Sequence, residues 1–254
     1  MKQRIIFSHG DKGGVGKSAV AALLMDLSLR RYGKAGLVEG DTTTPDVWNR
    51  YRSCTDVIAK KIPLNLAGDA STAIGQLSVW LQELGEKAVD VPTVIVNLPA
   101  NASETLDQHA AMLVRVCKKL GYDVSACYSI GAGNDAADAL GHSLDTGFLS
   151  MLDPDKRAVI YPAMFGPKSA FVWHVRQKDT DTHDYRHCVL PKLEPAFVAS
   201  MVFTTEGPFS QMRAGLVDGF GPYQEVVLED WLEQCDAALW NLLPENEDRD
   251  DGQP

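Results

Sequence analysis

The chain has 254 residues, of which 45% are hydrophobic and 23% charged, proportions typical of globular proteins. Asp and Glu outnumber Lys and Arg by 34 to 24, which gives a net charge of -10. This balance argues against a protein whose main task is to coat DNA or anionic lipid, because phosphate binding needs clustered cations. We expect a cytoplasmic protein, since no apolar run approaches the length of a membrane helix and no secretory signal opens the chain.

The first third of the sequence alternates between strand-like and helix-like segments. Residues 4–8 form a short β-rich run, and after a glycine-rich stretch residues 19–31 carry leucines at helical spacing. Residues 35–39 predict a second strand. A polar turn follows, and Pro45 would lie in the first turn of the next helix with Thr44 as its cap.

The same alternation continues to residue 243. We expect further helices at 71–87, 103–120, 134–149 and 225–243, and further strands at 93–96, 124–130, 157–165, 171–175 and 187–190. Strands alternating with helices predict an α/β fold, a mainly parallel twisted sheet with helices on both faces. We expect one domain over residues 1–243 and an acidic, disordered tail over 244–254.

The glycine-rich stretch HGDKGGVGKS lies between the first strand and the first helix. Glycine at 13, 14 and 16 would let backbone amides turn toward an anion, and the following helix would direct its positive end there. Lys17 could reach the β and γ phosphates, Ser18 could bind Mg²⁺, and Ala19 could offer another amide. The alternative is a glycine-rich turn that binds no ligand, which the adjoining Lys-Ser pair disfavours.

Residues 12–18, Lys-Gly-Gly-Val-Gly-Lys-Ser, resemble the deviant Walker A motif of the ParA/MinD superfamily of P-loop ATPases. The general P-loop pattern has glycine where this chain has Asp11. The resemblance implies ATP or ADP with Mg²⁺ as cofactors, and a dimer that sandwiches two ATP molecules. In that dimer Lys17 would act on its own nucleotide and Lys12 on that of the partner subunit. The nucleotide contacts implied run from Asp11 to Ala19 and include Val15.

Two later segments support this resemblance. The sequence VEGD at 38–41 follows the second strand, where the family has an Asp-x-Asp pair. Asp41 matches the second carboxylate, which orients the attacking water or holds Mg²⁺, and Glu39 takes the place of the first. A helix or turn cap is the alternative role of Asp41. The sequence VIVNLPA at 94–100 has Asn97 where the family usually has aspartate, so Asn97 would meet nucleotide or magnesium without bringing charge.

The resemblance implies an ATP-hydrolysing dimerisation switch that serves plasmid or DNA partition, stability or conjugative mobilisation. The Leu-Pro-Ala at 98–100 is similar to the StbB and TraL branch of plasmid stability and mobilisation proteins. The alternative is a nucleotide-gated scaffold that hydrolyses ATP very slowly or not at all, which Asn97 favours. We expect a homodimer and a protein partner. Membrane binding is not expected, because the last helix is acidic, and the net charge does not support DNA contact.

Other chemistries are weakly indicated. Residues 131–136, GAGNDA, match a loose dinucleotide-binding fingerprint, but a tight turn with Asn134 capping a helix explains them equally. An iron–sulfur reductase of the same superfamily would need a cysteine soon after residue 97, and residues 97–108 contain none. The five cysteines form no Cys-x-x-Cys pair, which indicates neither a zinc ribbon nor a dithiol redox site.

Overall fold

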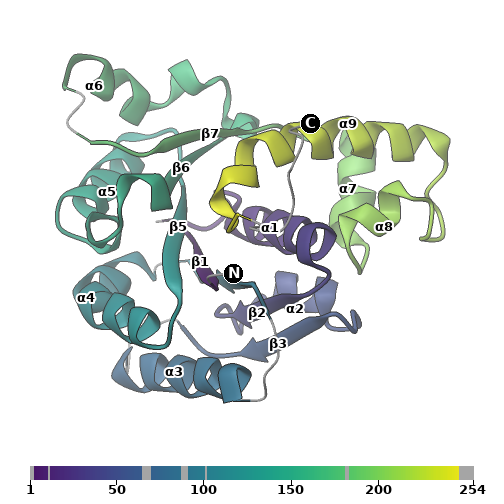
Figure 1. Ribbon diagram of the computed structural model, residues 1–254. Helices are drawn as coiled ribbons and strands as arrows, with labels where there is room; N and C mark the ends of the chain where they lie inside the picture. Colours follow the sequence, from purple (N-terminus) through teal and green to yellow (C-terminus); the bar gives the residue numbers. More distant parts are fainter. Residues whose placement is uncertain are drawn as a thin grey trace.

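Seven parallel strands form the centre of the computed structural model, which describes residues 3–10, 12–64, 70–86, 91–100, 102–180 and 183–245 (Figure 1). The strands are β1 (Arg4–His9), β2 (Ala35–Glu39), β3 (Val57–Lys61), β4 (Thr93–Asn97), β5 (Asp123–Ser129), β6 (Arg157–Pro162) and β7 (Arg186–Leu190). Their order across the sheet is β3-β2-β4-β1-β5-β6-β7, and each neighbouring pair is parallel. The predicted α/β fold with a parallel sheet is therefore confirmed.

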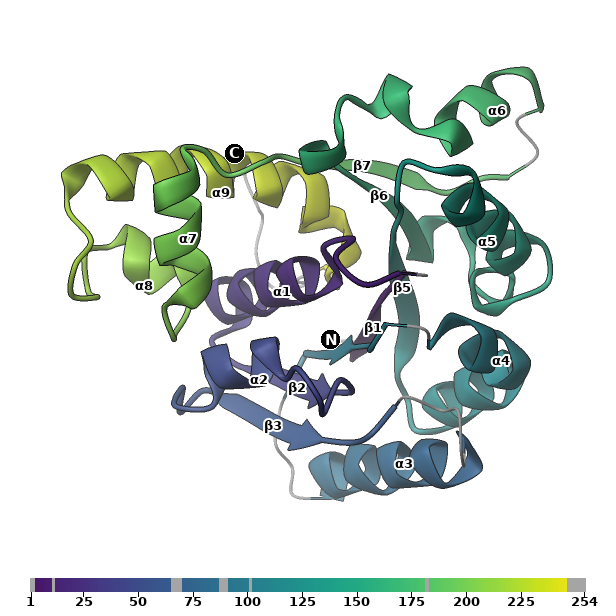
Figure 2. The same cartoon turned by 180° about the vertical axis from the view of Figure 1, so that it is seen from behind.

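Helices cover both faces of this sheet. They are α1 (Lys17–Tyr32), α2 (Asp46–Tyr51), α3 (Ala70–Glu86), α4 (Ser103–Lys119), α5 (Asn134–Asp145), α6 (Val172–Thr180), α7 (Ala196–Thr204), α8 (Phe209–Arg213) and α9 (Pro222–Leu239). Figures 1 and 2 show α3, α4 and α5 on one face, and α1, α2, α7, α8 and α9 on the other. Single 3-10 turns lie at Phe148–Met151, Pro154–Lys156, Ala163–Phe165, Lys168–Ala170 and Trp240–Leu242.

The two helical layers explain why the central strands carry apolar residues at successive positions. In β1, Ile5 and Phe7 pack into the core shared with α3, α4 and α5, while Ile6 packs into the core shared with α1 and α9. Every residue of β2 and β4 is buried as well. A strand covered on both faces must be apolar at successive positions. No described helix is long and apolar enough to cross a bilayer.

Most predicted elements are present, with boundaries shifted by a few residues, and two predictions are wrong. Residues 171–175 do not form a strand, because Val172 begins helix α6. Parallel neighbours need a crossover connection, and α6 provides it between β6 and β7. Pro45 is the N-cap of α2 rather than part of its first turn, so Thr44 is not the cap. The predicted helix at 134–149 ends at Asp145.

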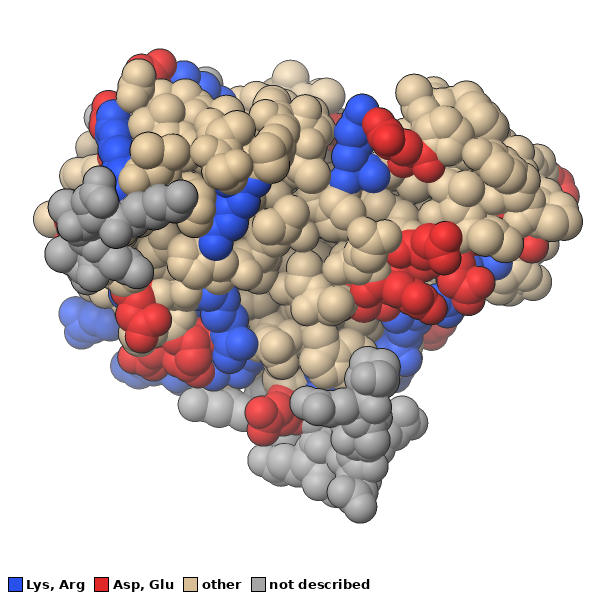
Figure 3. Space-filling view, turned by 90° about the horizontal axis from the view of Figure 1, so that it is seen from above, with Lys and Arg blue, Asp and Glu red and all other residues tan. Residues whose placement is uncertain are grey.

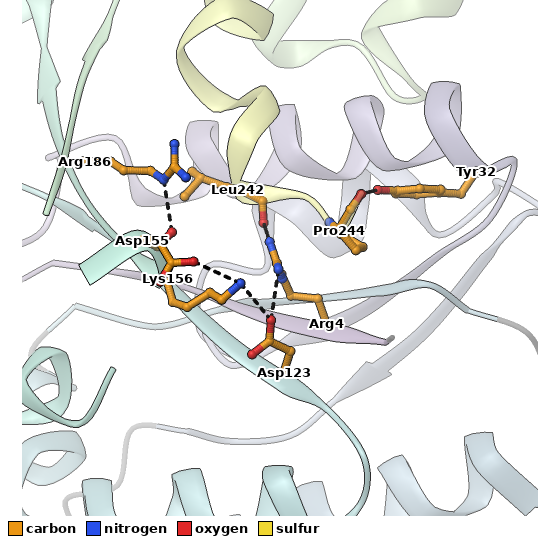
Figure 4. A network of polar contacts seen from close by, with 8 residues as sticks. All are labelled: Arg4, Tyr32, Asp123, Asp155, Lys156, Arg186, Leu242 and Pro244. Carbon is orange, nitrogen blue, oxygen red and sulfur yellow. Dashed lines mark hydrogen bonds and ion pairs between the residues drawn. The ribbon is translucent and has the colours of Figure 1, made fainter. Parts of the chain in front are cut away.

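A polar network joins the amino edge of the sheet to the end of the described chain. Arg4 donates to the Leu242 carbonyl at 2.9 Å and forms an ion pair with Asp123 at 2.9 Å. Lys156 reaches the same Asp123 carboxylate at 3.1 Å, and Figure 4 shows these side chains converging. Burial alone would raise the pKa of Asp123, but the contacts with Lys156 and Arg4 outweigh it and lower that pKa.

We predict that Asp123→Asn lowers the free energy of unfolding by about 1–2 kcal/mol at neutral pH, because two partly buried cations lose their counterion. Because the pKa of Asp123 is lower in the folded chain, its stabilisation is present above the unfolded pKa of about 4 and is lost below it. Urea unfolding at several pH values from 7 to 3 should show that the difference in free energy of unfolding between Asp123→Asn and wild type becomes smaller in acid. The exposed Asp138–Arg176 pair gives the control, Asp138→Asn, which should cost under about 1 kcal/mol. Equal costs for both variants would contradict the prediction.

Candidate functional site

The loop between β1 and α1 lies where the strand order reverses. Strand β1 connects through α1 back to β2, and its neighbour β4 connects through α4 across to β5, so the loop leaves the carboxyl edge of the sheet where these two connections diverge. Gly14 and Gly16 have φ values of 76° and 92°, and Gly16 is the N-cap of the 16-residue helix α1. Glycine adopts this left-handed conformation without strain. The loop thus directs the amino end of a long helix, with its unsatisfied N–H groups, toward solvent.

Lys17 folds back over this loop. Its Nζ donates to the Lys12 carbonyl at 2.6 Å, and its own carbonyl accepts the Ser8 hydroxyl at 2.8 Å. The residue is only 7% exposed, so its ammonium is held in place rather than extended into water. The arrangement places one positive charge over the loop, at the end of the helix where an anion is already favoured.

Lys12 points away from the loop toward α5. Its Nζ forms an ion pair with Asp135 in the first turn of α5 at 2.9 Å, and both side chains are largely exposed. The hydrogen bond and the charge of Lys12 lower the pKa of Asp135. The lysine that the family resemblance assigns to a partner subunit is therefore paired within its own chain. Asp11, also predicted to contact nucleotide, lies outside the described residues.

A cavity of about 710 Å³ opens beside the loop. Among the predicted site residues, its lining includes Gly13, Gly14, Gly16, Lys17, Ser18, Ala19 and Asp41. Lys12, Val15 and Asn97 are not in the lining, and the Val15 side chain is buried. The opposite walls come from α2 and from the end of α7, with Phe203, Thr204, Thr205 and Glu206. A volume of this size is typical of sites for drug-sized ligands.

Asp41 caps a turn, which is the alternative role that the sequence offered for it. Its Oδ1 accepts the backbone N–H groups of Thr43 at 3.1 Å and Thr44 at 3.0 Å. These bonds order the segment between β2 and α2, and the side chain still lines the cavity. Both hydrogen bonds use the same carboxylate oxygen, Oδ1. Turn formation and ligand contact are thus compatible here.

Glu39 and Asn97 form a buried pair beneath the cavity. The Glu39 carboxylate accepts Asn97 Nδ2 at 2.8 Å, the Asp41 N–H at 3.2 Å and the Trp48 N–H at 3.0 Å. It is fully buried, and this burial raises its pKa to about 7 despite the three hydrogen bonds. Asn97 is 1% exposed, and its Oδ1 has no hydrogen-bond partner among the described residues. The pair ties β2, β4 and α2 together under the Asp41 turn.

His9 is a second buried polar group that the sequence did not single out. It ends β1, lies behind the loop and packs edge-on against Tyr128 with ring centroids 4.8 Å apart. Burial, together with the charge of Lys17, lowers the pKa of His9 to about 3. The imidazole is therefore neutral and adds no positive charge to the site.

Comparisons with known proteins give one short sequence match. No protein-family model matches the chain. Protein MobD from Acidithiobacillus ferrooxidans is 41% identical over 56 residues, which amount to 22% of this chain and 25% of MobD. The matched region thus covers about a quarter of that relative.

Comparisons with solved structures give low-identity matches. The signal recognition particle receptor FtsY from Elizabethkingia anophelis is 12% identical, with a TM-score of 0.47 over 74% of this chain and 59% of that chain. A nucleotide-binding protein from Archaeoglobus fulgidus, in complex with ADP, is 10% identical, with a TM-score of 0.48 over 97% and 94%. In this chain itself, a glycine-rich loop joins β1 of the parallel sheet to the amino end of helix α1, the strand–loop–helix arrangement of a P-loop.

We predict that Asn97→Asp does not simply restore a missing carboxylate. It would put a second carboxylate against the buried Glu39 in place of a 2.8 Å hydrogen bond, and should lower the free energy of unfolding by about 3–5 kcal/mol at pH 8. The cost should shrink below pH 7, where Glu39 takes up a proton. In the double variant Glu39→Gln/Asn97→Asp the amide can donate to the new carboxylate, and part of the stability should return. If Asn97→Asp were as stable as wild type in urea unfolding at pH 8, the Glu39–Asn97 pair would not contribute to stability.

Proposed function

We propose that this chain binds ATP with Mg²⁺ at the loop between β1 and α1 and uses it to control dimerisation, as the ParA/MinD resemblance implies. The observation that carries the proposal is the loop itself. Two left-handed glycines, a buried lysine and the amino end of α1 converge at one cavity. Oriented amides, a helix amino end and a lysine are the groups that cradle the phosphates of a nucleotide.

The donor groups present fit a nucleotide and its magnesium ion. Backbone amides from Gly13 to Ala19 would hold the phosphates, and Lys17 would neutralise their charge. Ser18 and Asp41 both line the cavity, and hydroxyl and carboxylate oxygens suit Mg²⁺. Magnesium would neutralise charge on the transferred phosphoryl group. Asn97 would act only from beneath, through Glu39 and the Asp41 turn.

The ion pair of Lys12 does not prevent it from acting across a dimer. Its bond to Asp135 lies at the surface, with side chains 51% and 82% exposed. Exposed ion pairs contribute little to stability, so a nucleotide held by a partner subunit could compete for this lysine. In that position the ammonium would stabilise charge on the phosphoryl oxygens, as an arginine finger does.

The buried pair also supports a second candidate, a nucleotide-gated scaffold with little or no hydrolysis. The residue at the end of β4 is neutral, and the nearby Glu39 carboxylate is fully enclosed by its three hydrogen bonds. In either case we propose, by analogy of the motifs alone, a role in plasmid or DNA partition, stability or mobilisation in the cytoplasm.

We predict that Lys17→Ala abolishes ATP binding in isothermal titration calorimetry, because it removes the charge held over the loop. Lys12→Ala should bind ATP with wild-type affinity, since Lys12 lies outside the cavity, but should lose ATP-dependent dimerisation or turnover. Lys34→Ala, which removes an exposed lysine after α1, is the matched control and should change neither. If Lys12→Ala equals wild type in both assays, the deviant Walker A assignment is wrong.

Phosphate release separates the two candidate functions. We predict slow release from ATP by wild type, dependent on Mg²⁺ and lost in Asp41→Ala, which should still bind ATP. Loss of both release and binding would assign Asp41 to structure rather than turnover. Absence of release from wild type, with binding intact, would favour the scaffold.

A further inference from the structure

Helix α7 has apolar side chains both on its buried face and on its exposed face. Its sequence is AFVASMVFT, and Val198 and Val202 are its buried positions. Phe197 and Phe203 remain 53% and 45% exposed. A helix that is apolar all round is normally enclosed by its own protein or by a partner. The exposed face of α7 therefore calls for an explanation.

The exposed face of α7 continues onto α9. Phe197 stacks on Tyr223 of α9, with ring centroids 6.0 Å apart and an interplanar angle of 13°. Tyr223 is 57% exposed, and Val226, one turn further along α9, is 56% exposed. Phe197, Tyr223 and Val226 are called the α7–α9 patch below. Aromatic side chains exposed side by side are typical of interface anchors.

An acidic rim borders this patch. Glu229, Asp230 and Glu233 are exposed and follow Val226 at helical spacing on α9. No ion pair joins these three carboxylates to another described residue. Figure 3 shows acidic side chains gathered where α9 lies, beside an uncharged expanse at the same end of the molecule. The surface thus combines apolar anchors with uncompensated negative charge.

The charge decides between the possible occupants. A second copy docked through the same surface about a two-fold axis would bring two acidic rims together, and the chain as a whole carries -10. Anionic lipid would be repelled by the rim. A basic, amphipathic segment satisfies both features, because its apolar side chains can cover the patch while its cations meet the rim.

We propose that the α7–α9 patch and its acidic rim form a docking surface for a partner protein, through an amphipathic helix whose apolar residues are flanked by Lys or Arg. The surface adjoins the candidate site, because the far end of α7 contributes Phe203 and Thr204 to the cavity wall. A docked segment would therefore lie close to bound nucleotide, a consequence that rests on the proposed function. The docking itself does not need nucleotide.

The test uses the full chain without nucleotide and a fluorescent amphipathic peptide of Leu and Lys, about 18 residues or five helical turns long. Fluorescence anisotropy at about 150 mM salt should show saturable binding. A peptide with Glu in place of Lys should bind at least tenfold more weakly. Because the peptide is tested without nucleotide, failure here is distinct from failure of ATP binding.

Two variants locate the binding. The patch variant replaces the three apolar side chains with serine, as Phe197→Ser/Tyr223→Ser/Val226→Ser. The rim variant reverses the charge of two rim residues, as Glu229→Lys/Glu233→Lys. Each variant should bind the peptide at least tenfold more weakly than wild type. Each variant has a matched control. The control for the patch is Val79→Ser, which changes an equally exposed apolar residue of α3. The control for the rim is Asp56→Lys/Glu86→Lys, which changes exposed acidic residues elsewhere. The controls should bind like wild type, and circular dichroism should show that all four variants are folded.

Three results would overturn the proposal. If Asp56→Lys/Glu86→Lys weakened peptide binding as much as the rim variant does, the peptide would be attracted by the net charge of the protein alone. Unchanged affinity in the patch variant would remove the apolar anchors from the interface. A wild-type dimer in light scattering without peptide, dissociated by the patch variant, would show that a second copy covers the surface.

Discussion

The position of β1 at the centre of a parallel sheet constrains everything else in the candidate site. Helix α1 leads from β1 back to β2, while α4 leads from the neighbouring β4 across to β5 on the other face, so these two connections leave in opposite directions and open a space above the carboxyl end of β1. The glycine-rich loop enters that space, and α1 starts directly from it. The ends of β2 and β4 arrive at the same edge, which brings the Asp41 turn beside Ser18 and Lys17. The place of the loop and its cavity is thus a consequence of strand order.

Much of this fold could be predicted because its central elements are strongly patterned. Buried strands such as β2 and β4 are mostly apolar, and α3 and α9 carry clear apolar stripes. The misplaced or missing elements lie where the pattern is weak. Strand β3 lies at the edge of the sheet and ends in two lysines, so its sequence lacks the apolar pattern of a buried strand. Helix α7 is apolar on most of its sides, so its sequence shows no clear apolar stripe. The start of α6 resembles a strand in sequence, and only the parallel pairing of β6 with β7 shows that a crossover helix is needed there.

The candidate site was less predictable, because motif spacing does not show which side chains bond to one another. Of loop residues 13–19, all but the buried Val15 line the cavity, because their placement follows from local geometry. Asn97 does not line the cavity, because the carboxylate at the end of β2 binds its amide. Glu39 becomes the buried acceptor that joins two strands to α2, and the motif alone gave it no such role. The contribution of α7 to the cavity wall depends on long-range packing, which a single sequence does not reveal.

We propose that ATP, bound at the loop, closes two chains into a dimer in which Lys12 leaves Asp135 for the nucleotide of the partner subunit. The most direct measurement is the mass in solution, by light scattering, with ATP and Mg²⁺, with ADP and Mg²⁺, and without nucleotide. Calorimetry on the same samples establishes that nucleotide is bound. We expect a dimer with ATP and a monomer in the other two states. One unchanged mass in all three states, with ATP bound, would contradict the proposal.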